Sequence, residues 1–92
     1  MAQGDAFFIS GRGTGGQSET FSINGVLKVT EAKLIQDVKI EIDEGSGYRE
    51  LWYEPSSNLT IDGGAAWYIP QGTLRLSFDY DRDYRIVGVY IK

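Results

Sequence analysis

Strict alternation of apolar and polar residues is the feature that most constrains this sequence. In residues 38–43, Val38, Ile40 and Ile42 alternate with charged residues, and in residues 73–80 leucine and aromatic residues alternate with polar ones. A period of two places every second side chain on the same face of a β-strand, whereas a helix needs a period of about 3.6 residues. Both segments therefore predict strands with one buried and one solvated face.

Short segments rich in Gly, Pro, Asn and Asp separate further strand-like runs. They are residues 24–25, 44–47, 55–58, 62–64, 70–72 and 81–83. The strands expected between them are residues 5–10, 19–23, 26–31, 34–43, 48–54, 58–61, 66–69, 73–80 and 84–91. Eight or nine short strands at this spacing predict an all-β fold, either a compact antiparallel β-sandwich, with the jelly roll as one form, or a small barrel. At 92 residues the chain is expected to form one domain, residues 1–92.

Two local patterns add to this prediction. Asn24-Gly25 is the strongest short-range signature of a hairpin, so we expect residues 19–23 and 26–31 to be joined by a tight turn. Residues 30–38 also fit a short helix, because Thr30 is a possible N-cap. The alternation that follows favours a strand there.

The absence of Cys and His excludes much chemistry. Disulfides, the common zinc and haem ligands, and cysteine- or histidine-dependent catalysis are all removed. Glu41, Glu50 and Glu54 lie on neighbouring predicted strands, but no pattern singles out an acid–base pair. A domain this small rarely holds a catalytic cleft. We therefore expect a protein that is not an enzyme and uses no cofactor.

The charge balance also limits the classes of molecule that this chain is expected to bind. The formal net charge is −4, which disfavours nucleic acid and anionic lipid surfaces. No apolar run approaches the roughly 20 residues that a membrane span needs. With no disulfide or metal to stabilise a small core, contacts with other subunits become the leading source of extra stability.

A glycine-rich segment, residues 11–16, formally matches the G-x-G-x-x-G pattern of dinucleotide-binding proteins. That motif requires a helix to begin at its third Gly, and here strand-like residues and a turn follow instead. We interpret residues 11–16 as a flexible loop that can order on a ligand or a neighbouring subunit, with Arg12 as the contact residue.

Three carboxylates, Asp79, Asp81 and Asp83, form a D-x-D-x-D run that invites a calcium interpretation. The helix-loop-helix pattern fails because its required Gly and Glu positions hold Tyr84 and Tyr90. A β-type calcium site stays open, but Arg82 and Arg85 favour a solvated, salt-bridged turn, so we expect no metal.

Adjacent aromatic residues suggest a second surface. Neighbours on a strand point to opposite faces, so one ring of each pair, Trp52-Tyr53 and Trp67-Tyr68, should face away from the core. Exposed rings can stack on pyranose sugars while polar side chains bind the hydroxyls. The candidate glycan-binding residues are Trp52, Trp67, Tyr68, Asp62 and Gln71. Core and interface packing is the simpler explanation, because Trp and Tyr are enriched in both settings.

The strand expected at residues 84–91 is apolar on both faces. Ile86 and Tyr90 lie on one side, and Val87, Val89 and Ile91 lie on the other. Such a strand is either central and covered, or part of a subunit interface. Our first hypothesis is a non-catalytic assembly module that self-associates or decorates a virion, tail or surface fibre, with an interface of Arg12, Val87, Val89 and Ile91. The alternative is a carbohydrate-binding module.

Overall fold

The computed structural model describes residues 4–34, 38–52, 59–61 and 67–92. In these residues the chain forms strands joined by loops, and no helix occurs among them. The strands are β1 (Ala6–Gly13), β2 (Ser18–Ile23), β3 (Leu27–Leu34), β4 (Val38–Asp43), β5 (Tyr48–Trp52), β6 (Leu59–Ile61), β7 (Trp67–Ile69), β8 (Gly72–Phe78) and β9 (Arg82–Tyr90).

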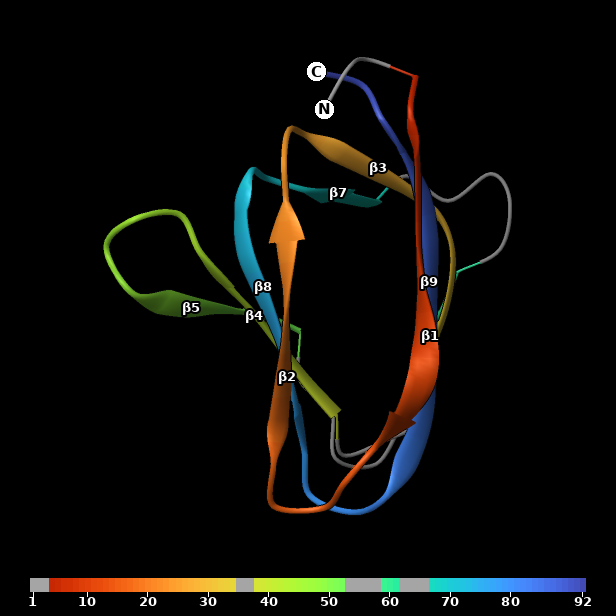
Figure 1. The fold of residues 1–92 in the computed structure, drawn as a ribbon, viewed down its shortest axis with the longest axis vertical. Helices are drawn as coiled ribbons and strands as arrows, with labels where there is room; N and C mark the ends of the chain where they lie inside the picture. The colour runs from red at the N-terminus through yellow and green to blue at the C-terminus, as the bar shows by residue number, and fades with distance from the viewer. Residues whose placement is uncertain (1–3, 35–37, 53–58, 62–66) are drawn as a thin grey trace.

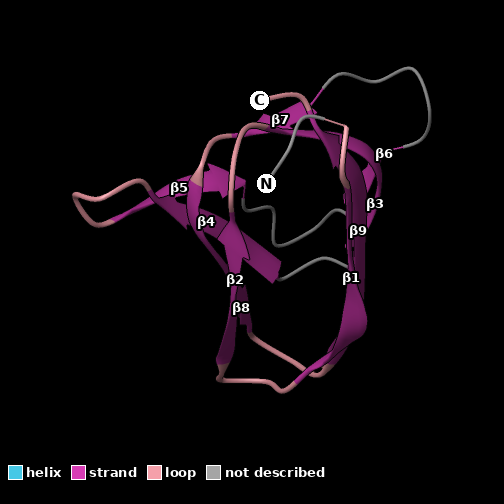
Figure 2. Ribbon diagram, turned by 45° about the horizontal axis from the view of Figure 1, so that its top comes forward, coloured by secondary structure: helices cyan, strands magenta, loops and turns pink. Residues whose placement is uncertain are grey.

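The strands form two antiparallel sheets that face one another (Figure 1). Sheet A has the order β1-β9-β3, and both β6 and β7 pair with the free side of β3, at opposite ends of it. Sheet B has the order β2-β8-β4-β5. The all-β prediction and the sandwich architecture are therefore confirmed, and the two sheets are seen from another direction in Figure 2.

The pairing of the strands is nested. The first strand pairs with the last, β2 pairs with β8, β3 pairs with β6 and β7, and β4 pairs with β5. This is the order of a long antiparallel hairpin rolled up into two sheets, which is the jelly-roll arrangement.

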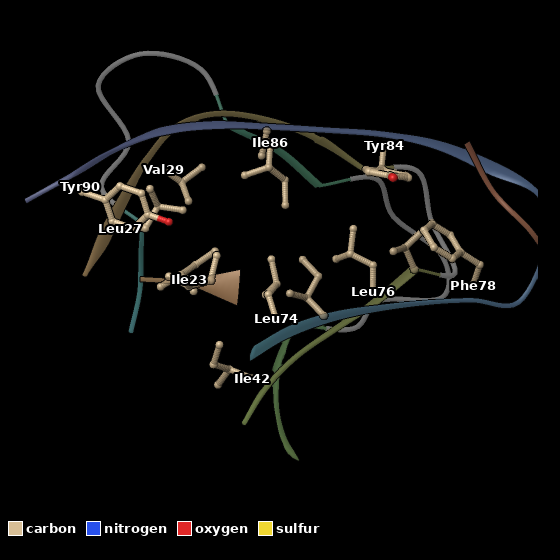
Figure 3. Packing of buried hydrophobic residues seen from close by; sticks show 14 residues of the cluster. Ile23, Leu27, Val29, Ile42, Leu74, Leu76, Phe78, Tyr84, Ile86 and Tyr90 are labelled. Carbon is tan, nitrogen blue, oxygen red and sulfur yellow. The ribbon is translucent and has the colours of Figure 1, made fainter. Parts of the chain in front are cut away.

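The core lies between the sheets and follows directly from the alternation in sequence. Every second side chain of β4, β8 and β9 points inward and is buried, whereas the intervening ones are partly or fully exposed. Figure 3 shows Val29, Ile86 and Tyr90 of sheet A facing Leu74 and Leu76 of sheet B. Among the described residues no polar or charged residue is buried in this core, so its stability comes from apolar area removed from water.

The prediction that Asn24-Gly25 forms a hairpin turn between two paired strands is wrong. β2 and β3 belong to different sheets, and residues 24–26 carry the chain from one layer to the other. Gly25 also lacks the positive φ that a two-residue hairpin of this type would require. A Cβ atom on Gly25 would collide with the main-chain oxygen of Lys92. Glycine is therefore needed there for a close approach of two main-chain segments.

The turn at residues 44–47, in contrast, does join two paired neighbours, β4 and β5. Gly45 and Gly47 have φ values of 123° and 105°, which favour glycine. Their N–H groups both donate to Oδ1 of Asp43, at 2.7 and 3.1 Å. The resulting hairpin projects from the body of the sandwich (Figure 1). The helical alternative for residues 30–38 is wrong where the structure describes them, since residues 30–34 belong to β3 and Val38 begins β4; residues 35–37 lie outside the described residues.

Candidate interaction surface

The outward face of sheet B is polar. Serine, threonine and charged side chains alternate with the buried residues along β2, β8 and β4. At its centre the Arg75 guanidinium contacts Oε1 of Glu41 at 3.0 Å and lies 3.7 Å from the ring centroid of Tyr48. The charges of Arg75 and Glu41 are paired, and both side chains remain partly exposed to water. This face of the sandwich therefore has the polar character of a solvent-exposed surface.

The outward face of sheet A is more apolar. Residues that pair directly across antiparallel strands share a face, so Ala6 and Phe8 of β1 lie beside Val89 and Val87 of β9. We call Ala6, Phe8, Val87, Val89 and the outward Tyr68 of β7 the A face. Phe8 and Tyr68 are 56% and 48% exposed. Val87 and Val89 are partly exposed, and so is Ile91, which directly follows β9.

A charged row crosses the same face of sheet A. Oε1 of Glu31 on β3 accepts a 2.9 Å hydrogen bond from Nε of Arg85 on β9, and the Arg85 guanidinium lies 4.8 Å from the ring centroid of Phe8. The three side chains therefore form a continuous contact across β3, β9 and β1. This contact orders the exposed Phe8 ring at the margin of the apolar residues.

The sequence leaves open whether the strand at the C-terminal end is a covered central strand or part of a subunit interface. The structure answers this question in part. β9 lies at the centre of sheet A, between β1 and β3, and its inward side chains Tyr84, Ile86 and Tyr90 are buried. The outward Val87 and Val89 are not fully covered by the described residues. β9 is thus a core strand whose outward side chains are partly exposed among the described residues.

The glycine-rich segment is not a loop throughout, which corrects the interpretation of residues 11–16. β1 continues to Gly13, and only residues 14–17 connect it to β2. A Cβ atom on Gly13 would overlap the ring of Phe78, and one on Gly11 would lie 2.9 Å from the Tyr84 hydroxyl. These glycines leave room for two aromatic rings beneath β1, which explains them without any ligand.

Arg12, the contact residue expected in that loop, lies in β1. Its Nη1 is 3.0 Å from Oδ1 of Asp83, the residue directly opposite it on β9, and both side chains are well exposed. Arg12 points to the same side of sheet A as Phe8, since alternate residues of a strand share a face. Its predicted contact with a partner remains a prediction.

The aspartate run near residue 80 forms a structured turn. Oδ1 of Asp81 accepts a 2.8 Å hydrogen bond from the N–H of Gly15, and Asp83 pairs with Arg12. The part of the chain that the structure describes contains no group of three His, Cys, Asp or Glu side chains arranged to hold a metal ion. A hollow of about 280 Å³ lies next to this turn, lined by Lys33, Asp83, Tyr84 and Arg85.

The candidate sugar-binding rings are not brought onto one surface. Trp67 pairs with the buried Val29 and packs against the core, whereas Tyr68 points to the opposite side of sheet A. Trp52 lies on β5 of sheet B and also packs against the core. Gln71 is exposed in the loop before β8. Asp62 lies outside the described residues.

Phe8 is the surface residue that the sequence did not single out. It sits within Ala6-Phe7-Phe8-Ile9, a run without alternation, so its outward direction cannot be read from periodicity. The pairing of Phe8 with Val87 supplies that direction. The spacing of Val87 and Val89 in the sequence does indicate which side of β9 they occupy. Extending that assignment to Phe8 requires knowing that β1 pairs with β9.

Within the described residues there is no helix of the length and apolar character that crossing a bilayer requires. A search for relatives of this chain finds no matching family model, no matching curated protein and no matching solved structure.

Proposed function

We propose that this chain is a non-catalytic assembly module that associates with copies of itself, as a component of a larger structure of the virion, tail or surface-fibre kind. The observation that carries the proposal is the contrast between the two outward faces of the sandwich. Sheet B presents serine, threonine and ion-paired side chains, whereas sheet A presents Phe8, Val87 and Val89 beside the ion pairs Arg85–Glu31 and Arg12–Asp83. An apolar patch rimmed by charges is typical of a protein–protein interface.

Two further features support this function. A small sandwich without disulfides gains stability from subunit contacts, and this sequence has no Cys. The jelly-roll order is common in viral capsid and lectin domains, which supports the setting by analogy of fold alone.

The carbohydrate-binding alternative has less support. Of the three rings proposed for stacking, Tyr68 alone is exposed, while Trp52 and Trp67 pack against the core. A single exposed ring can contact one sugar face but does not form an extended platform. The glycan hypothesis predicts binding of the parent protein on a broad glycan array and its loss in Tyr68→Ala.

The test of the assembly function is the solution mass, measured by light scattering behind a sizing column at several concentrations. We expect the parent chain to give a stable multiple of 10.2 kDa. Val89→Asp places a charge in the A face and should give a folded protein of lower mass. Thr20→Asp, on the exposed outward side of β2, is the matched control and should keep the parental mass.

A parent chain that is monomeric at every concentration would contradict self-association. A Val89→Asp protein that stays folded and keeps the parental mass would show that the A face is not the contact. Far-UV circular dichroism of each variant separates dissociation from unfolding.

A further inference from the structure

The outer edge of β1 has no partner strand among the residues that the structure describes. β1 is the outermost strand of sheet A, and its neighbour in the described structure is β9. The N–H of Tyr90 donates to the carbonyl oxygen of Asp5, at 2.9 Å. Antiparallel pairs alternate between bonded and non-bonded positions, so the odd residues of β1 face β9. The even residues, Ala6, Phe8, Ser10 and Arg12, direct their N–H and C=O groups away from it.

β1 also lacks the protection that edge strands usually carry. Natural edges are short or bulged, or they carry Pro and inward charges. β1 is eight residues long, contains no Pro, and has Arg12 as its single charged residue. The other edge strands are shorter: β2 has six residues, β5 has five, and β6 and β7 have three each. Phe7, Phe8 and Ile9 are consecutive residues in the first half of this long edge.

We infer that β1 pairs antiparallel with β1 of a second copy of this chain, about a two-fold axis at Ile9. The inference rests on the proposed function and names the partner and the element that meets it. A strand edge is complementary to another strand, and a two-fold axis lets one edge satisfy its own copy. The pairing joins the two copies of sheet A into one continuous sheet.

Charge favours the antiparallel direction. Asp5 lies just before β1 and Arg12 near its end, so the two ends of the strand carry opposite signs. In a parallel pair the Arg12 side chains of the two copies would lie together on the outward face, whereas an antiparallel pair separates them by most of the strand. A second copy in the antiparallel direction therefore meets this edge without placing like charges together.

The register follows from the two faces of sheet A. Opposed residues share a face, so inward Phe7 and Ile9 must meet inward residues, and outward residues must meet outward ones. With Ile9 on the axis, residues 6–12 of both copies overlap, Phe8 lies opposite Ser10 of the second copy, and Phe7 lies opposite Gly11 of the second copy. This arrangement uses the open N–H and C=O groups, and it makes the Phe8 side chains of the two copies diagonal neighbours on the outward face.

The first experiment removes one hydrogen bond at the open edge. Ser10→Pro deletes an N–H that does not bond to β9, and Pro is tolerated at such edge positions. Ser10→Ala keeps the N–H and is the matched control. We expect Ser10→Pro to remain folded and to lose the two-fold contact, with half the parental mass if the parent is a dimer, while Ser10→Ala keeps the parental mass. A folded Ser10→Pro protein of parental mass would overturn the inference.

The second experiment tests the register and does not depend on a proline variant that folds. The chain has no Cys, so introduced thiols report on a single contact. Opposed Cα atoms in a bonded antiparallel pair are about 5.5 Å apart, within the range that a disulfide spans. Phe8→Cys mixed with Ser10→Cys should oxidise to the mixed covalent dimer, and each variant alone should cross-link far less. Equal cross-linking in all three samples, or none, would overturn the proposed pairing.

The outcome separates this inference from the proposed function. If Val89→Asp lowers the mass and Ser10→Pro does not, the assembly function stands and the edge pairing is wrong. If Ser10→Pro alone lowers the mass, the contact is the edge of β1 and not the A face. A monomeric parent chain contradicts both.

Discussion

The hydroxyl of Tyr84, on β9, donates a hydrogen bond of 3.2 Å to Oε1 of Glu19, on β2, and so links the two sheets across the sandwich. The Tyr84 ring also packs against Phe21 and Phe78, with ring centroids 5.9 and 5.7 Å away. Gly11 makes room for this ring beneath β1. One side chain therefore joins the polar and apolar contacts at this end of the molecule.

Replacing the hydroxyl alone should weaken this link. Tyr84→Phe keeps the ring contacts and leaves Glu19, which is partly exposed, to bind water. We expect a loss of about 1 kcal/mol in the free energy of unfolding, in the range for a net hydrogen bond. Urea denaturation monitored by circular dichroism measures it. A variant as stable as the parent would show that the Tyr84–Glu19 bond adds nothing to stability.

The same pair predicts how stability depends on alkaline pH. Burial, and then the nearby negative charge of Glu19 and the hydrogen bond to it, raise the pKa of Tyr84 above its ordinary value of 10.0. The folded state therefore holds the Tyr84 proton more tightly than the unfolded state does. The corresponding stability is present below pH 10.0 and is lost as pH rises through the folded-state pKa. We expect the unfolding free energies of the parent and Tyr84→Phe to converge above pH 10. A difference that stays constant to high pH would contradict this linkage.

Gly13 should not tolerate even a methyl group. In Gly13→Ala the new Cβ atom would overlap the buried Phe78 ring, so the ring or the strand must move. Overpacking of this kind costs about 1–3 kcal/mol. Ser10→Ala, at an exposed position of the same strand, is the control and should change the unfolding free energy by less than about 0.5 kcal/mol. Thermal unfolding of both variants measures the difference.

Calcium should not stabilise this chain. The Asp81 carboxylate already accepts a hydrogen bond from the Gly15 N–H, and Asp83 is paired with Arg12. We expect the melting temperature to be the same in millimolar calcium and in a chelator. A calcium-dependent rise that Asp81→Asn abolishes would restore the calcium interpretation of this turn.

The sequence predicted most strand positions because the core alternates strictly. In β4 and β8 the buried residues occur at every second position, and both segments were located from that pattern. The pairing of strands was less accessible. Asn24-Gly25 looked like a local hairpin, yet its glycine is required by a contact with Lys92, far away along the chain. Local turn chemistry cannot reveal a constraint set by a distant segment.

The sequence predicts only part of the candidate surface, because the rest depends on which distant strands pair. Val87 and Val89 could be assigned to one side of a strand from their spacing, and the structure places them on the outward face of sheet A. Phe8 joins them through a pairing that spans nearly the whole chain. Trp52 and Trp67 could not be assigned as inward or outward, since each stands beside another aromatic residue. The packing of the described core decides their direction.

The nested order of the strands also governs how the molecule must form. β1 finds its neighbour in sheet A when β9 is available, and β9 is the last strand along the chain. During synthesis β1 emerges before β9, so its ladder cannot close until the intervening strands have also been made. Contacts so distant in sequence slow folding, and an unpaired apolar strand invites association in the meantime. The timing of β9 therefore sets how long this chain stays exposed to misassembly.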